Sequence, residues 1–405
     1  MYRLPAGSMF SRQRAFAGIH VLQIRRHPRH QPRAFPRPVF RILRAARDRP
    51  WSQPCPRRHA WSKPWGSRAK TKYQGGRATE SEGNTAKAIV QTRYGSPDVF
   101  ELREIEKPVV DDDGVLVRVR AASVNALDWH LMRGIPLVIR LGTGLRRPKN
   151  PIPGVDVAGD VEAVGRNVTQ FRPGDAVFGI GSGAFAEYVC GKEKNFVPKP
   201  AGLTFEQAAA VPVAGETALQ GLRDKGQIRR GQKVVVNGAS GGVGTFAVQI
   251  AKSFEADVTA VCSPKNVDMV RSIGADRVID YTREDFTRDG RRYDLIFDVA
   301  GSHSLSECRR ALSLNGTLVR AGVSSREKPT ILPFFTTPVL SRFVRQKIVV
   351  YITKHRKEDL VALKQLIEAG KVTPVIDRSY PLREVPEAIR YLGEGHPRAK
   401  IVITV

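Results

Sequence analysis

The pattern of apolar and polar positions divides the chain into three stretches. Residues 1–86 show no sustained apolar periodicity. From Lys87 to Val197, short runs of β-branched residues follow one another and dense Gly and Pro positions separate them, which is typical of a compact, barrel-like β domain. From Thr204 onward, apolar strands alternate with helical patterns, which favours an α/β domain.

The α/β stretch predicts a doubly wound parallel sheet, because its strands are short continuous apolar runs. Predicted strands cover 234–236, 258–262, 277–280, 295–299 and 317–321, with 347–352 as a sixth candidate. Predicted helices cover 243–254, 266–273, 358–369 and 385–392, and a closing strand covers 400–405. An earlier helix should open with a capping box at Thr204 and be interrupted by Pro212.

Positive charge changes the interpretation of the first stretch. The chain has 66 Lys and Arg against 39 Asp and Glu, a formal net charge of +27 over 405 residues. Residues 1–86 hold 19 of these basic residues and 3 of the acidic ones. A stretch so basic and aperiodic is predicted to be a disordered tail.

Three interpretations of this tail stay open. It can be an unstructured extension, including one that follows a start codon assigned too early. It can be a mitochondrial transit peptide, whose composition it has, although Arg12 shares a helical face with Ile19. It can also be a nucleic-acid arm, in which aromatic residues between the cations stack on bases. We expect a cytoplasmic protein, or a mitochondrial one if residues 1–86 contain a transit peptide.

Several protein classes are disfavoured. The four cysteines are widely scattered and form no CxxC pair, which argues against a zinc ribbon, an iron–sulfur site and a disulfide scaffold. No uninterrupted apolar run reaches the length of a membrane span, since the nearest, over 331–352, contains Arg342, Arg345 and Lys347. We therefore expect no membrane span.

The strongest chemical signal is the segment Val234–Gly244, with the sequence VVVNGASGGVG. It follows an apolar strand and opens a helix, and Ala239-x-Gly241-x-x-Gly244 fits the dinucleotide fingerprint. In such loops one glycine lets the pyrophosphate approach the backbone, and the next lets the helix pack closely on the strand. The alternative is a tight turn without a ligand. The residues expected to bind the cofactor here are Ser240, Gly241, Gly242, Val243 and Gly244.

The end of the second strand of this sheet favours NADPH. NAD-binding proteins place an acidic residue about 20 residues beyond the loop, and Val261–Asn266 contains none. Ser263 can donate to a 2′-phosphate, Lys265 can add a charge-assisted bond, and Tyr281 can supply a hydroxyl. Lys265 alone can equally be a solvated surface residue, so the missing acid is the stronger indication.

Three segments carry a resemblance to a known family: 238–244 (GASGGVG), 274–281 (GADRVIDY) and 395–400 (GHPRAK). They resemble the medium-chain dehydrogenase/reductase superfamily, and within it the zinc-free quinone oxidoreductase-like branch. The resemblance implies a GroES-like β catalytic domain, interrupted by a Rossmann cofactor domain and completed by the C-terminal segment. The expected limits are 87–212, 213–355 and 356–405, after the tail at 1–86. Family members are often dimers, so a homodimer is possible.

The same resemblance implies that no metal is bound. Zinc-binding members carry a Cys ligand and a Gly-His-Glu motif, and the corresponding stretches here, 123–128 and 153–156, lack the Cys and the His. Asp128 and Asp156 are expected to be hydrogen-bonded structural residues, because zinc prefers three or four N, S or O ligands.

Family resemblance also implies roles at the reaction centre. It places Asn125 beside the nicotinamide and the substrate, Thr217 against the nicotinamide, and Gly322 where close approach to the ring is needed. From the residues alone, Asn125 is equally a turn residue after a strand. His130 is expected to be a packed or capping residue, and no general acid is identifiable.

Together these observations predict a zinc-independent, NADPH-dependent oxidoreductase that transfers hydride to a quinone or an α,β-unsaturated carbonyl. Such electron-poor acceptors need positioning more than a Lewis acid. One alternative is a reductase of simple ketones or aldehydes. Another is an NADPH-binding protein whose basic tail or basic face binds RNA.

Overall fold

The first strand of the structure forms a two-stranded ribbon. The computed structural model describes residues 84–322, 345–395 and 397–405. Strand β1 (Thr85–Gln91) runs antiparallel to β2 (Phe100–Glu106). The strand starts at Thr85 rather than at Lys87, because Thr85 and Ala86 pair with Glu106 and Ile105. Residues 1–83 of the predicted tail lie outside the described residues.

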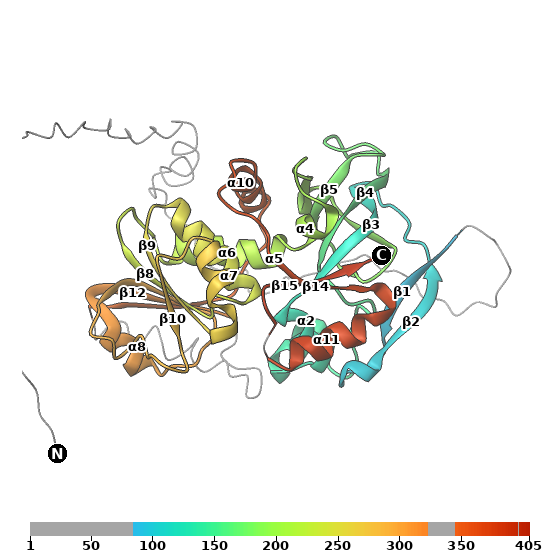
Figure 1. The fold of residues 1–405 in the computed structure, drawn as a ribbon. Helices are drawn as coiled ribbons and strands as arrows, with labels where there is room; N and C mark the ends of the chain where they lie inside the picture. The colour runs from blue at the N-terminus through green and yellow to red at the C-terminus, as the bar shows by residue number, and fades with distance from the viewer. Residues whose placement is uncertain (1–83, 323–344, 396) are drawn as a thin grey trace, which may run out of the picture. The chain divides into compact units, whose positions relative to one another are not determined.

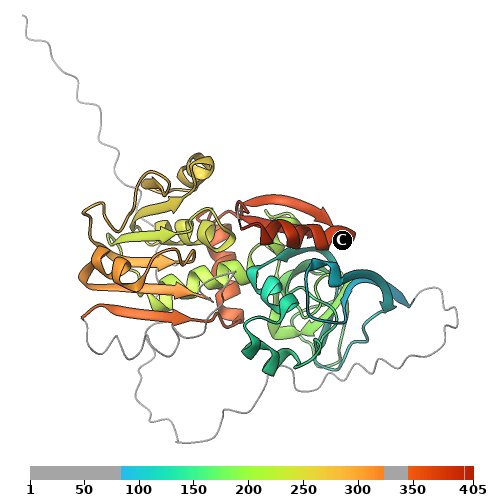
Figure 2. The ribbon, with the colours of Figure 1, turned by 90° about the horizontal axis from the view of Figure 1, so that it is seen from below.

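A seven-stranded sheet has the order β14-β15-β3-β4-β5-β7, with β6 paired to β3 off this path. Its strands are β3 (Gly114–Val124), β4 (Asp156–Val164), β5 (Ala176–Ile180), β6 (Tyr188–Lys192), β7 (Phe196–Pro198), β14 (Ile376–Pro381) and β15 (Lys400–Thr404). Strand β15 pairs antiparallel with β3, and Ile401 stands opposite Val124. Both views show the red C-terminal strands with the blue and green ones (Figures 1 and 2). The C-terminal segment therefore completes the GroES-like sheet.

The second sheet is six-stranded and parallel, in the order β10-β9-β8-β11-β12-β13. Its strands are β8 (Lys233–Asn237), β9 (Asp257–Cys262), β10 (Arg277–Asp280), β11 (Tyr293–Asp298), β12 (Leu312–Ala321) and β13 (Lys347–Tyr351). Val234 and Val236 of β8 belong to one buried cluster and Val235 to another. Since successive side chains point to opposite faces, both faces are buried, as predicted for a Rossmann sheet.

A first group of helical elements lies between β7 and β14 in the chain. They are α4 (Phe205–Ala209), α5 (Pro212–Leu219), the π-helical η4 (Gln220–Lys225), α6 (Gly242–Ser253), η5 (Pro264–Asn266), α7 (Val267–Ser272), α8 (Leu305–Ala311) and α10 (Lys357–Glu368). Among them, α4 contacts β3 and β4 of the seven-stranded sheet. Thr204 and Gln207 exchange both bonds of a capping box, and Pro212 starts a new helix, which confirms both predictions. Helix α8 was not predicted.

The remaining helical elements lie among the strands of the β region in sequence. They are η1 (Pro97–Val99), α2 (Ala126–Arg133), η2 (Leu137–Ile139), α3 (Arg140–Thr143), η3 (Glu193–Asn195), η6 (Leu382–Glu384) and α11 (Val385–Gly393). Within the described part of the chain, no helix has the length and apolar character needed to cross a membrane.

Candidate active site

The glycine loop between β8 and α6 has a backbone that only glycine fits at two positions. Gly238 has φ +87°, in the region that favours glycine. A Cβ atom on Gly244 would lie 2.1 Å from the Gly238 carbonyl oxygen, so a side chain there would push the helix away from the strand. Among the atoms of the described residues, a Cβ on Gly241 would meet only that same oxygen, at 3.5 Å. The backbone at Gly241 is therefore open to close approach.

Two hydrogen-bonding neighbours hold this loop. The amides of Gly238 and Ala239 donate to the Val261 carbonyl at the end of β9, at 3.2 and 3.0 Å. From the other side, the Ala399 amide donates to the Ser240 carbonyl at 2.7 Å. The first amides of α6 have no acceptor within the helix, and they stand at its positive end. This cradle fits a dinucleotide pyrophosphate.

The residues expected at the 2′-phosphate lie at two adjacent strand ends. Ser263 follows β9, and its Oγ accepts a bond of 3.0 Å from Asn266 Nδ2. Tyr281 follows β10, its amide donates to the Cys262 carbonyl at 3.2 Å, and its side chain is 53% exposed. Lys265 is exposed. Ser263 and Lys265 follow β9 and Tyr281 follows β10, so all three lie near the carboxyl ends of these two neighbouring strands, at one edge of the sheet.

Gly322 directly follows strand β12. Its φ is +75°, its amide donates to the Tyr351 carbonyl at 3.1 Å, and no atom of the described residues lies within 4 Å of the place a Cβ would take. The conformation thus favours glycine.

Thr217 lies on α5, where two bonds fix its hydroxyl. The hydroxyl donates to the Val213 carbonyl at 2.6 Å, and it lies 2.7 Å from the hydroxyl of Thr353, which follows β13. Tyr351 donates through its own hydroxyl to the Thr217 carbonyl. The end of β13 and helix α5 are therefore held together at Thr217.

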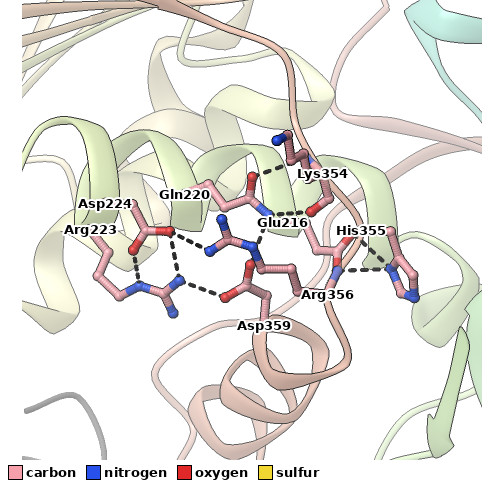
Figure 3. Close-up of polar contacts among 8 residues, drawn as sticks. All are labelled: Glu216, Gln220, Arg223, Asp224, Lys354, His355, Arg356 and Asp359. Atoms are coloured by element: carbon pink, nitrogen blue, oxygen red, sulfur yellow. Dashed lines mark hydrogen bonds and ion pairs between the residues drawn. The ribbon is translucent and has the colours of Figure 1, made fainter. Parts of the chain in front are cut away.

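A second set of polar contacts continues along α5 and η4 (Figure 3). Gln220 accepts from the amide of Lys354 at 3.1 Å and donates to its carbonyl at 2.6 Å. His355 Nδ1 lies 3.1 Å from Glu216 Oε1. Burial raises the pKa of Glu216, while its hydrogen bond to His355 acts in the opposite direction. These contacts position the segment that carries Thr353.

Asn125 lies directly after β3 and is buried, and protein atoms hold both ends of its amide. Its Nδ2 donates to Asp156 Oδ2 at 2.9 Å, and its Oδ1 accepts from Lys400 Nζ at 2.7 Å. Lys400 was not predicted to belong to the site, although it ends the segment 395–400 that carries the family resemblance. Its local signal is a lysine opening an otherwise apolar strand, KIVIT, and an edge lysine exposed to water gives the same pattern.

Asp156 is the centre of this buried cluster. Its Oδ2 also accepts from Ser123 Oγ at 2.8 Å and lies 3.3 Å from Lys400 Nζ, while its Oδ1 accepts from the Val213 amide at 3.0 Å. The expected hydrogen-bonded role of Asp156 is confirmed. Among the described residues, no three His, Cys, Asp or Glu side chains are grouped to hold a metal ion.

Asp128 lies on α2 beside this cluster. Its Oδ2 accepts from the Asn125 amide at 2.7 Å, and its buried Oδ1 has no hydrogen-bond partner among the described residues. Burial raises the pKa of Asp128 to about 7. Burial also lowers the pKa of Lys400, while the nearby Asp156 acts to raise it. His130, on the same helix, lies 3.1 Å from the Ile135 carbonyl through Nδ1, as expected for a capping histidine.

Comparison with known proteins agrees with this geometry. The family description "Alcohol dehydrogenase GroES-like domain" matches residues 111–201, and "Zinc-binding dehydrogenase" matches 273–403. A chloroplast envelope quinone oxidoreductase homolog of Arabidopsis thaliana is 31% identical over 335 residues, which are 79% of this chain and 99% of the relative. The chain belongs to the medium-chain dehydrogenase/reductase superfamily. It falls in the quinone oxidoreductase-like branch and is an oxidoreductase.

Further members of this superfamily are similar over most of the chain. An NADPH-dependent alkenal/one oxidoreductase of Arabidopsis thaliana is 33% identical, covering 78% of this chain and 79% of the relative. A mitochondrial NAD(P)H oxidoreductase of Mus musculus is 31% identical, with 83% and 93% covered. The solved quinone oxidoreductase of Coxiella burnetii has a TM-score of 0.71 and 29% identity, over 79% of this chain and 99% of that one.

Proposed function

We propose that this chain is an NADPH-dependent reductase that transfers hydride to a quinone or an α,β-unsaturated carbonyl and works without zinc. One juxtaposition carries the proposal. Ser240 of the glycine loop bonds to Ala399, and the next residue, Lys400, bonds to Asn125. The loop suited to a pyrophosphate and the amide expected beside the nicotinamide are thus joined by two consecutive residues.

Bound NADPH would supply the hydride, and the residues of this chain would hold and orient the reactants. The first-turn amides of α6 would hold the pyrophosphate, Thr217 would contact the nicotinamide, and Asn125 would lie beside the substrate. Gly322 would leave room near the ring. Relatives named as quinone and alkenal/one oxidoreductases support this class of acceptor.

The proposed preference for NADPH is supported by the edge at Ser263, Lys265 and Tyr281. Asp280, the carboxylate that ends β10, already accepts from the amide and the hydroxyl of Thr282 at 3.0 and 2.8 Å. The proposed zinc independence is supported by Asp128 and Asp156, whose carboxylates bind protein donors at the stretches where zinc-binding members carry ligands.

The proposal also covers the domain organisation, the oligomeric state and the cellular location of the protein. Residues 87–212 and 356–405 would form the catalytic domain, and 213–355 the cofactor domain. Light scattering would test the proposed homodimer. Imaging of the full chain would show whether the protein is cytoplasmic or mitochondrial. Imaging of a chain starting at Ala86 would show whether the location depends on the tail. Relatives named as chloroplastic or mitochondrial support an organelle as the alternative. A nucleic-acid role of the tail concerns residues outside the described ranges.

The decisive experiment is cofactor oxidation over a panel of quinones, enones and simple ketones and aldehydes, with NADPH and NADH in parallel. We expect turnover with quinones or enones, little with simple carbonyls, and activity that survives dialysis against a zinc chelator. Preference for simple ketones would support the alternative reductase. Loss of turnover on chelation, with restoration by zinc, would reject metal independence.

A further inference from the structure

We propose that Lys400 is a positioning residue that couples the glycine loop to the orientation of the Asn125 amide. The inference rests on the proposed function, because it assigns Asn125 to the substrate side of the site. Three contacts carry it: a backbone bond before Lys400, the packing of its aliphatic stem, and the bonds of its ammonium group.

The backbone contact fixes where Lys400 starts. Ala399 donates to Ser240 and forms an isolated parallel bridge with Gly241. Ala399 has φ +66°, an unusual conformation for a residue other than glycine. Strand β15 therefore begins directly against the loop that the pyrophosphate would occupy, and a shift of the loop would displace Lys400.

The stem of Lys400 packs on the first residue of α6. A Cβ built on Gly242 would lie 3.0 Å from Cδ and 3.7 Å from Cγ of Lys400. Lys400 is 2% exposed, so its stem runs through protein from the loop to the cluster around Asp156. The side chain is thus in contact with the cofactor loop at one end and with Asn125 at the other.

The ammonium group fixes which way the Asn125 amide faces. Lys400 Nζ donates to Asn125 Oδ1, while Asn125 Nδ2 donates to Asp156. A flipped amide would place its NH₂ against the ammonium group and its oxygen against the carboxylate, and both bonds would be lost. Only one amide orientation therefore satisfies the cluster.

A purely structural role explains this arrangement poorly. Burying an ion pair costs much of the solvation of both charges, and apolar residues of similar size often stabilise a protein as well or better. Asp156 and Lys400 are 0% and 2% exposed. The pair lies between the cofactor loop and the Asn125 amide. A role in positioning that amide accounts for a buried ion pair at this place.

The test uses the double variant Lys400→Met/Asp156→Asn, because Lys400→Met alone would leave a buried carboxylate without its cation. Lys347→Met is the matched control, since Lys347 also opens a strand but is exposed. We expect the double variant to bind NADPH, by fluorescence titration, within about threefold of the parent. We expect its kcat to fall at least tenfold, with a larger primary deuterium isotope effect from deuterated NADPH. A folded double variant with the parental kcat would overturn the inference.

A second readout does not depend on turnover. Selective ¹⁵N-Asn labelling, with Asn125→Ala to assign the resonance, would follow the side-chain amide by NMR. We expect slow proton exchange in the parent and fast exchange in the double variant. 2′-Phospho-ADP-ribose, which has the pyrophosphate but no nicotinamide, should shift this resonance in the parent only. An equal shift in both proteins, or none in either, would overturn the coupling. Absence of turnover in the parent would instead reject the proposed function.

Discussion

Arg223 and Asp359 form an ion pair in which the carboxylate is buried and the guanidinium half-buried, with 2.6 Å between Nη2 and Oδ1, although 136 residues separate them in the chain. Arg223 belongs to η4 and Asp359 to α10, and Gln220 donates to the second oxygen of the same carboxylate at 2.8 Å. Figure 3 shows both partners on the carboxylate. The pair therefore joins α10 to the helix that continues from Thr217.

We expect Asp359→Asn to destabilise the fold. Removing one partner of a fully buried pair costs about 3–5 kcal/mol in general, and we expect about 2–3 kcal/mol here because Arg223 is only half-buried and keeps its pair with Asp224. Glu368→Gln, in the more exposed pair with Lys364 on the same helix, is the control and should cost below about 1 kcal/mol. Thermal melting of the three proteins measures the difference. Equal melting temperatures would show that the pair does not hold α10.

Gly244→Ala should disrupt the cofactor loop. The new methyl group would meet the Gly238 carbonyl oxygen at 2.1 Å, and since that oxygen belongs to the backbone, strand and helix must separate. We expect the NADPH dissociation constant to rise at least tenfold. Gly202→Ala is the control, because no described residue has an atom within 4 Å of its Cβ position. Unchanged NADPH binding in Gly244→Ala would contradict the assignment of this loop.

Asp128 should make stability depend on pH. Burial raises its pKa in the folded state to about 7, above the value of about 4 in an unfolded chain. The folded state then binds the proton more tightly, so stability is greatest at acidic pH and is lost as the pH rises from about 4 through about 7. Asp128→Asn keeps an oxygen for the Asn125 amide and removes the titration.

The measurement is the melting temperature of parent and Asp128→Asn at intervals from pH 5 to 8. We expect the parent to lose stability relative to the variant as the pH rises. Asp156 and Lys400, the charged groups that act on Asp128, are present in both proteins, so their own titration largely cancels in the difference. A difference that stays constant with pH would show that Asp128 does not titrate in this range.

Local sequence pattern was sufficient where one short segment determines the structure. The apolar run at Val234–Val236 predicted a strand buried on both faces, and Gly244 predicted a close strand–helix contact. The short strands β5 to β7 were not predicted, because an antiparallel barrel needs only brief, weakly alternating segments that neighbouring strands complete.

Contacts between distant segments could not be predicted. Lys400 reaches Asn125 only because β15 pairs with β3 in the register that sets Ile401 opposite Val124. The pair of the half-buried Arg320 and the buried Asp298, at 3.0 Å, likewise depends on the neighbouring positions of β11 and β12. Charged residues that become buried by pairing look like surface residues in sequence, since their partners are far along the chain.

The preference for NADPH is the remaining prediction, and it depends on Ser263, Lys265 and Tyr281. Ser263 Oγ accepts from Asn266, which leaves its own proton to donate to a 2′-phosphate. Hydrogen bonds to charged groups contribute about 1.5–3 kcal/mol each, and the exposure of Lys265 and Tyr281 reduces this toward about 1 kcal/mol. Two or three such contacts would give roughly 100-fold discrimination in kcat/KM.

Lys265→Ala should therefore weaken NADPH with little effect on NADH, and Ser263→Asp should go further because its carboxylate repels the phosphate. Most of the change should appear in KM, since the 2′-phosphate is remote from the transferred hydride and binds the ground and transition states alike. Lys194→Ala, at another exposed lysine, controls for the loss of surface charge. Steady-state kinetics with both cofactors measure these effects. Equal parental values for NADPH and NADH, or an equal loss of both in Lys265→Ala, would reject the assignment of this edge. The glycine-loop argument would still hold, because the pyrophosphate that it concerns is common to both cofactors.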